Sequence, residues 1–126
     1  MKNIIVIIVD GLLKNRLHCF GYNHDTTPNI TKLCEKSTIY TNYWANSNAT
    51  HPLFASMYFS CHPLEHGILK HMQKGDYDKQ LWSDYMRNIG YDTLAIDNLY
   101  MGIEFDWVKR GFEQYITLGQ LYKDYN

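Results

Sequence analysis

The sequence lacks any excess of positive charge, which would mark a partner of nucleic acids. Its 12 Lys and Arg residues face 13 Asp and Glu residues, and the formal net charge is −1. This balance provides no attraction for a phosphate backbone or an anionic membrane surface. The aromatic residues, 11 Tyr among them, are scattered and form no basic stacking groove. We therefore exclude nucleic acid as a partner.

Long hydrophobic runs are also missing. The most apolar stretch, Ile4 to Val9, ends at Asp10 after six residues, whereas a membrane span needs about 20. No small-residue cleavage site follows, so the stretch does not match a signal peptide. We expect no membrane span, and the β-branched run instead predicts a central strand covered on both faces.

The cysteines show neither a disulfide pattern nor a zinc pattern. Cys19, Cys34 and Cys61 are odd in number and have no Cys-x-x-Cys spacing. Neither a disulfide framework nor a zinc knuckle is therefore indicated. Three free thiols predict a reducing, cytoplasmic location.

Strand and helix signals alternate along the 126 residues, of which 45% are hydrophobic. Runs of strand-forming residues predict strands at 4–9, 37–44 and 91–96. The segment 63–75 is typical of a loop, and Lys109-Arg110-Gly111-Phe112 is typical of a turn. Proline and cap signals predict helices after Thr27 and Thr50, and a third over 79–88 that Gly90 ends. The alternation predicts an α/β fold with a largely parallel sheet and flanking helices, in a single domain over residues 1–126.

Polar residues that could bind a metal or take part in catalysis stand where the predicted strands end. Ligands of open α/β sheets bind beyond the carboxyl ends of the strands, which places Asp10 and the pair Asp97-Asn98 at the binding edge. Thr50 stands just before Pro52, in the position of an N-cap at the positive end of a helix. A carboxylate repels an anion bound next to it unless a cation lies between them. A divalent metal held by Asp10 and Thr50 would supply that cation. Two ordinary alternatives stay open: a capping threonine and an Asp-Gly turn.

Several segments stand in order over nearly the whole chain: Val9-Asp10-Gly11-Leu12, Cys19-Phe20-Gly21-Tyr22, Thr27-Pro28-Asn29-Ile30, Thr50-His51-Pro52-Leu53-Phe54-Ala55-Ser56-Met57, Pro63-Leu64-Glu65-His66-Gly67-Ile68 and Arg110-Gly111-Phe112-Glu113-Gln114-Tyr115. Together they resemble the motifs of sulfatases and their relatives in the alkaline phosphatase superfamily. The segment that begins at Thr50 is in register with the family's nucleophile signature, Cys/Ser-x-Pro-x-Arg-Ala-Ser-Leu. The resemblance implies the N-terminal portion of an alkaline-phosphatase-like fold.

The departures from this pattern change the chemistry that the resemblance implies. Thr50 cannot become the formylglycine of sulfatases, and Phe54 replaces the signature Arg. Gly11 stands where the family has a second metal carboxylate, and Asp97-Asn98-Leu99-Tyr100 aligns with a Gly-Lys-x-His segment that contacts sulfate. The chain thus looks like the phosphodiesterase and phosphotransferase branches, with Thr50 as nucleophile and metal ligand, Asp10 as metal ligand and Asn98 as a substrate contact.

Two interpretations remain open. In the first, the chain is a metal-dependent hydrolase or transferase of small phosphate esters, or less favourably sulfate esters, that uses Mn²⁺, Zn²⁺, Mg²⁺ or Ca²⁺. In the second, it is a catalytically incomplete fragment with a structural or binding role, because family relatives are longer and carry further metal ligands downstream. His62, His66 and His71 could substitute as ligands, although His66 matches a structural position of the family. An incomplete fold would expose a sheet edge, through which copies of the chain could self-associate.

Overall fold

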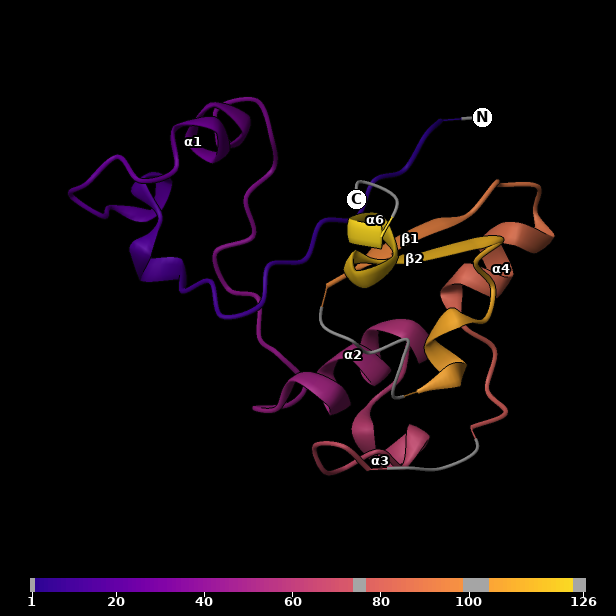
Figure 1. The fold of residues 1–126 in the computed structure, drawn as a ribbon. Coiled ribbons are helices and arrows are strands. Elements are labelled where there is room, and N and C mark those ends of the chain that lie inside the picture. The colour runs from indigo at the N-terminus through magenta and orange to yellow at the C-terminus, as the bar shows by residue number, and fades with distance from the viewer. Residues whose placement is uncertain (1, 74–76, 99–104, 124–126) are drawn as a thin grey trace. The chain divides into compact units, whose positions relative to one another are not determined.

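The structure is a computed structural model that describes residues 2–73, 77–98 and 105–123 (Figure 1). The chain divides into two compact units, Met1–Trp44 and Ala45–Asn126. Within the described residues the fold is mixed α/β, with several helices and a two-stranded parallel sheet. None of the described helices has the length and apolar character of a membrane span.

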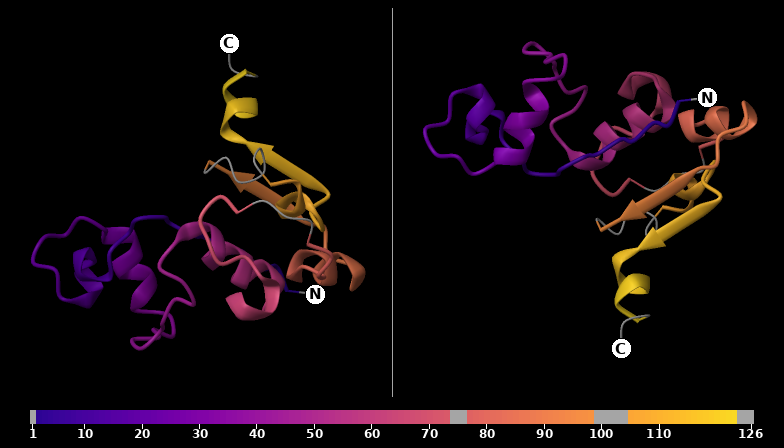
Figure 2. Two further views of the ribbon diagram at one scale, coloured as in Figure 1. Left: turned by 90° about the horizontal axis from the view of Figure 1, so that it is seen from below. Right: turned by 90° about the horizontal axis from the view of Figure 1, so that it is seen from above.

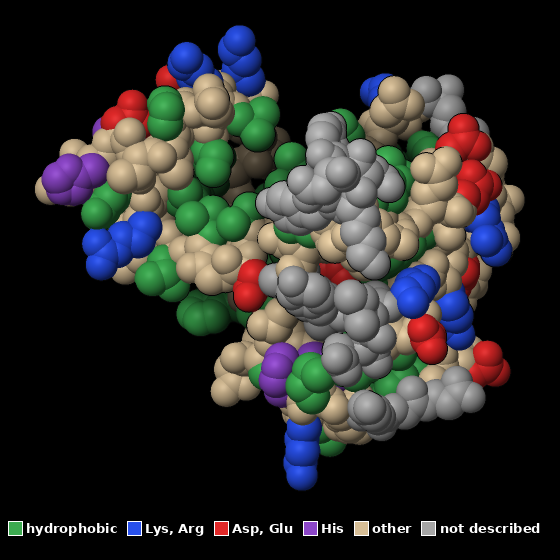
Figure 3. All heavy atoms as spheres, viewed as in Figure 1, with side chains coloured by type: hydrophobic (Ala, Val, Ile, Leu, Met, Phe, Trp, Pro, Cys, Tyr) green, Lys and Arg blue, Asp and Glu red, His purple; other side chains and the backbone are tan. Residues whose placement is uncertain are grey.

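The first unit contains two short 3₁₀ helices, η1 (Lys14–Arg16) and η2 (His18–Phe20), followed by helix α1 (Pro28–Cys34). Helix α1 begins as predicted, with Thr27 as N-cap and Pro28 in the first turn. Leu17 is the one buried residue among those described in this unit. Hydrophobic side chains consequently reach its surface (Figure 3).

Two predicted strands of this unit are not strands in the structure. Residues 4–9 form neither helix nor strand, and their side chains are 44–83% exposed. Residues 37–44 turn at positions 41–42 instead of extending, and Tyr40, Tyr43 and Trp44 are largely exposed. Both predictions were wrong for the same reason: a strand requires a neighbour to pair its N–H and C=O groups, and neither segment pairs with a described strand.

The second unit begins with helix α2 (Thr50–Phe59), the short helix α3 (Pro63–His66) and helix α4 (Trp82–Asn88). Helix α4 starts three residues later than predicted, and Gly90 follows its end at φ +92°, as predicted. Helix α3 lies in the segment predicted as a loop. There His62 is the N-cap, and its own N–H donates to Glu65 Oε1 at 3.3 Å.

The sheet pairs strands β1 (Leu94–Asp97) and β2 (Gln114–Thr117) in parallel, with Leu94 opposite Gln114 and Asp97 opposite Thr117. Strand β1 confirms the second half of the strand predicted at 91–96. In sequence order, the 3₁₀ helix η3 (Asp106–Lys109) comes after β1 and before β2, and helix α6 (Leu118–Lys123) follows β2. The two arrows run side by side in both views of Figure 2. Leu94 and Ile96 remain more than half exposed, so β1 presents an apolar surface.

The core of this unit lies between α2 and the segment around η3. Its largest fully buried aliphatic side chains, Ile68, Leu81 and Val108, are each at most 1% exposed. Burial of one such side chain contributes about 1.5–3 kcal/mol to stability. The remaining members of the core are Phe54, Ala55, Phe59, Phe105 and Trp107.

A tight turn at 109–112, predicted from Lys109-Arg110-Gly111-Phe112, joins η3 to β2. Phe112 N–H donates to Lys109 C=O at 3.2 Å, and Gly111 has φ +75°, as a type II turn requires. Neighbouring elements bind this turn: Ser83 Oγ donates to Arg110 C=O at 2.9 Å, and Thr93 Oγ1 donates to Gly111 C=O at 2.7 Å. The turn therefore links α4, through Ser83, to the residue that precedes β1, Thr93.

We predict that Gly111→Ala destabilises the chain by about 2–5 kcal/mol. The left-handed conformation costs an alanine about 1–2 kcal/mol, and overpacking adds about 1–3 kcal/mol. Overpacking arises because a Cβ at this position would lie 2.5 Å from the Ser83 carbonyl carbon and 2.7 Å from Ser83 Oγ. Denaturant unfolding measures the loss.

Gly67→Ala is the matched control. Gly67 has nearly the same φ, +76°, but no atom lies within 4 Å of a Cβ built on it. Gly67→Ala should therefore lose only the stability that the left-handed conformation costs, about 1–2 kcal/mol. Equal losses for the two variants would contradict close packing around the 109–112 turn.

Candidate functional site

Thr50 is the first residue of helix α2 and is half-buried. The N-cap is Ala49, whose N–H donates to Ser47 Oγ at 3.2 Å and whose C=O accepts from Leu53 N–H at 3.1 Å. The prediction of Thr50 as N-cap is thus wrong by one position, because the chain turns into the helix at Ala49. Thr50 nevertheless lies in the first turn, where backbone N–H groups have no intrahelical acceptor and the helix dipole is positive.

His51 anchors this helix start in the core. Its side chain is 0% exposed, and its ring stacks on Phe105 with centroids 3.9 Å apart and planes 18° apart. Trp107 continues the stack, with its centroid 6.0 Å from that of His51. Neither ring nitrogen of His51 has a hydrogen-bond partner in the described part of the chain. Burial, together with the nearby charges of His71 and His66, lowers the pKa of His51 to about 4, so the ring is neutral at pH 7.

His66 has a structural role, as predicted. Its Nδ1 accepts a hydrogen bond from Ile68 N–H at 3.1 Å, so the proton is on Nε2, which lies 3.0 Å from Ser56 Oγ. Burial first, and then the charge of Lys79, lowers the pKa of His66, so this ring too stays neutral. Because both of its nitrogens are engaged, His66 is unsuited to hold a metal in this arrangement.

The other predicted site residues lie in different places. Asp10 is an exposed residue of the predicted Asp-Gly turn in the first unit. Asn98 is exposed directly after β1, in the same unit as Thr50, whereas Leu99 and Tyr100 lie outside the described residues.

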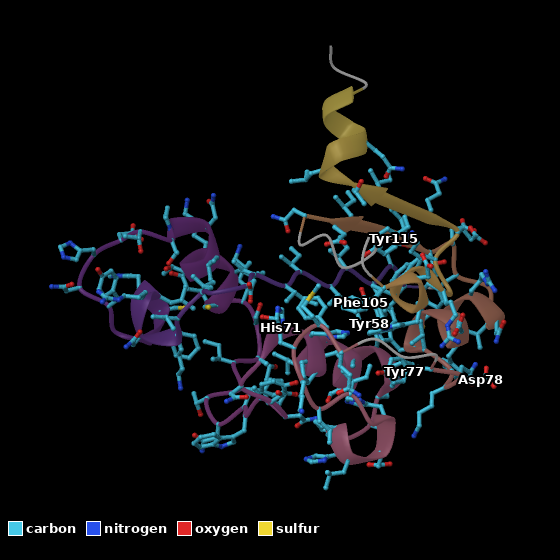
Figure 4. All side chains as sticks on the ribbon, turned by 60° about the horizontal axis from the view of Figure 1, so that its bottom comes forward. Tyr58, His71, Tyr77, Asp78, Phe105 and Tyr115 are labelled. Carbon is cyan, nitrogen blue, oxygen red and sulfur yellow. The ribbon has the colours of Figure 1, made fainter. Side chains whose placement is uncertain are left out.

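The carboxyl end of β1 approaches α2 at Tyr58. Asp97 accepts a hydrogen bond from Tyr115 O–H at 2.8 Å. Burial, and secondly the charge of Asp97, raises the pKa of Tyr58 to about 12, which keeps its hydroxyl protonated. Figure 4 shows Tyr58 and Phe105 on the side of α2 that faces the strand of Tyr115. Thr50 lies two turns before Tyr58, about 12 Å along the helix axis.

Other polar residues near the site are occupied in structural contacts. The ring of His62 caps α3, and Arg110 donates from its guanidinium to the carbonyl of Lys79. Lys109 forms an exposed ion pair with Asp106 at 3.3 Å. Phe54, in the position of the signature Arg, is 8% exposed and points into the core. These contacts give Lys109 and Arg110 structural roles.

The described residues do not fit a complete metal site. No group of three or more His, Cys, Asp or Glu side chains among them could hold a metal ion. A tightly bound catalytic metal needs three or four protein ligands. The predicted pair of Asp10 and Thr50 is therefore insufficient by itself.

The described residues define a mixed α/β protein with a hydroxyl residue in the first turn of a helix. The family model described as Sulfatase matches residues 2–126 of the chain. The chain therefore belongs to the sulfatase family, within the alkaline phosphatase superfamily, and is an ester hydrolase domain of that family. The family is generally metal-dependent and acts on esters. Neither the curated proteins nor the solved structures contain a match.

Sequence reasoning missed the aromatic stack around His51. The spacing of apolar residues describes one helix or strand at a time, whereas the stack joins α2 to residues more than fifty positions later. The available signal was a histidine inside a largely apolar helix. Its complete burial and its stacking on Phe105 favour a packing role.

We predict that the chain loses stability as the pH falls below 6.5, and that His51→Phe reduces this loss. The unfolded chain binds a proton on His51 below about pH 6.5, whereas the folded chain resists it until about pH 4. The stability contribution is therefore complete above pH 6.5, and about 3 kcal/mol is lost as the pH falls to 4. Denaturant unfolding at several pH values measures the difference.

His24→Gln is the control for this prediction, because His24 is an exposed histidine in the other unit. This variant should keep the pH dependence of the parent chain. If His51→Phe and the parent lose stability in parallel between pH 6.5 and 4, the buried neutral state of His51 is wrong.

Proposed function

We propose that the chain forms part of the catalytic domain of a metal-dependent phosphoester hydrolase or transferase with Thr50 as its nucleophile. The observation that carries the proposal is the position of Thr50, which is half-buried in the first turn of α2. The segment from Thr50 to Met57 resembles the family's nucleophile signature. First-turn N–H groups and the helix dipole favour an anion such as a phosphoryl group.

The proposed reaction has two steps. Thr50 Oγ attacks phosphorus and the ester alcohol leaves, which produces a phosphothreonine. Water or an acceptor alcohol then attacks the phosphorus and releases Thr50. The N–H groups of the helix start would stabilise the charge on the equatorial oxygens. Asn98, exposed after β1, is the proposed substrate contact.

Phosphate esters are preferred over sulfate esters for two reasons. A threonine has no route to the aldehyde hydrate used by sulfatases. Phe54, where the signature Arg would contact the anion, is directed into the core. The proposal keeps Asp10 and Thr50 as ligands of a divalent ion, which would require further ligands in addition to these two.

The second candidate is a catalytically incomplete chain with a structural or binding role. The lack of a three-ligand cluster among the described residues favours it. The exposed apolar side chains of β1, Leu94 and Ile96, would allow copies of such a chain to self-associate.

We predict metal-dependent hydrolysis of a chromogenic phosphodiester or phosphomonoester that exceeds hydrolysis of the matching sulfate ester. Thr50→Ala should lower kcat/KM at least about a thousandfold, because the nucleophile is lost. Thr50→Ser is the matched control: it keeps a hydroxyl and should retain part of the activity. Mass spectrometry of the acid-quenched enzyme should detect a phosphoryl group on Thr50.

The outcomes separate the two candidates. Full activity of Thr50→Ala would contradict the nucleophile, and faster hydrolysis of the sulfate ester would contradict the substrate class. No turnover with Mn²⁺, Zn²⁺, Mg²⁺ or Ca²⁺, combined with no rise in Tm, would favour the catalytically incomplete chain.

A further inference from the structure

Two cysteines of the first unit, 15 positions apart in sequence, meet in the structure. Cys34 Sγ lies 3.0 Å from Cys19 Sγ and donates its S–H to it. Cys19 is the middle residue of η2, and Cys34 is the last residue of α1. Both thiols are half-buried, and both are free. The fold therefore holds two thiols in direct contact, which the spacing of the cysteines did not predict.

We propose that Cys19 and Cys34 are a redox site that forms a reversible intramolecular disulfide by exchange with a small-molecule disulfide. The two sulfur atoms need to approach by only about 1 Å to reach the bonded distance of about 2.05 Å. Such contact strongly favours reaction within the pair over reaction with a second external thiol, since the local concentration of the partner is high.

The exchange balances with oxidised glutathione as the oxidant. One cysteine thiolate attacks the glutathione disulfide, which forms a mixed disulfide and releases one glutathione. The second cysteine attacks its neighbour in that mixed disulfide and releases the other glutathione. The cysteine pair loses two electrons and two protons, and one disulfide becomes two glutathione thiols. The hydrogen bond to Cys19 raises the pKa of Cys34, which favours the protonated thiol of Cys34.

The cross-link would strengthen the part of the chain that has the smallest core. Leu17 is the one buried residue described in the first unit, so hydrophobic burial stabilises that unit weakly. A disulfide would tie η2 to α1 and limit the opening of the loop between them. Cys61 belongs to the second unit, where Lys79 Nζ lies 4.0 Å from its sulfur, and takes no part.

The test is a thiol count on the whole chain after incubation with oxidised glutathione. Alkylation in denaturant should add one group to the oxidised chain and three to the reduced chain. Trypsin cleaves after Arg16, Lys32 and Lys36, so the disulfide should join peptide 17–32 to peptide 33–36 until a reductant separates them. In the folded chain, trypsin should cleave after Lys32 about tenfold more slowly once the pair is oxidised.

Cys61→Ser should keep the linked peptides, and Cys19→Ser should lose them. Three alkylated thiols after oxidation, a link that contains Cys61, or glutathione left on both Cys19 and Cys34 would each overturn the redox pair. Linked peptides with unchanged cleavage after Lys32 would overturn the restraint on α1.

Discussion

The second unit depends on the stacking of His51 against Phe105 and Trp107. This contact joins the first turn of α2 to the segment before the last strand, and Trp107 extends it to Phe59 with centroids 4.9 Å apart. One side chain thereby both closes the core and fixes the start of the helix. Thr50 precedes His51 directly, so the position of the proposed nucleophile follows from a packing contact that involves no ligand.

The same contact limits the chemistry available around Thr50. A pKa of about 4 makes the ring of His51 a weak base, and the ring is fully buried, so His51 is poorly suited to activate the threonine. Tyr58 keeps its proton, and Asp97 is engaged by Tyr115. In the proposed reaction, activation of the hydroxyl would come from the helix start and from a bound divalent cation.

Local signals in the sequence predicted the local features and failed for long-range ones. Proline and glycine signals placed the start of α1, the end of α4 and the 109–112 turn correctly, because each depends on the conformation of a few neighbouring residues. The strands at 4–9 and 37–44 were predicted from composition, but a strand exists only with a partner. Pro52 indicated that Thr50 stands at a helix start. The burial of His51 and the contact of Cys19 with Cys34 could not be predicted in this way, because they depend on residues distant in sequence.

Amide hydrogen exchange of the parent chain and of His51→Ala tests the central claim most directly. If the stack holds the unit together, the amides of α2 and of Val108 exchange slowest in the parent, and His51→Ala accelerates both to a similar extent. The amides of α1, in the other unit, should keep their rates. Acceleration confined to α2, with η3 unchanged, would contradict the account, as would amides at 4–9 that exchange as slowly as those of α2.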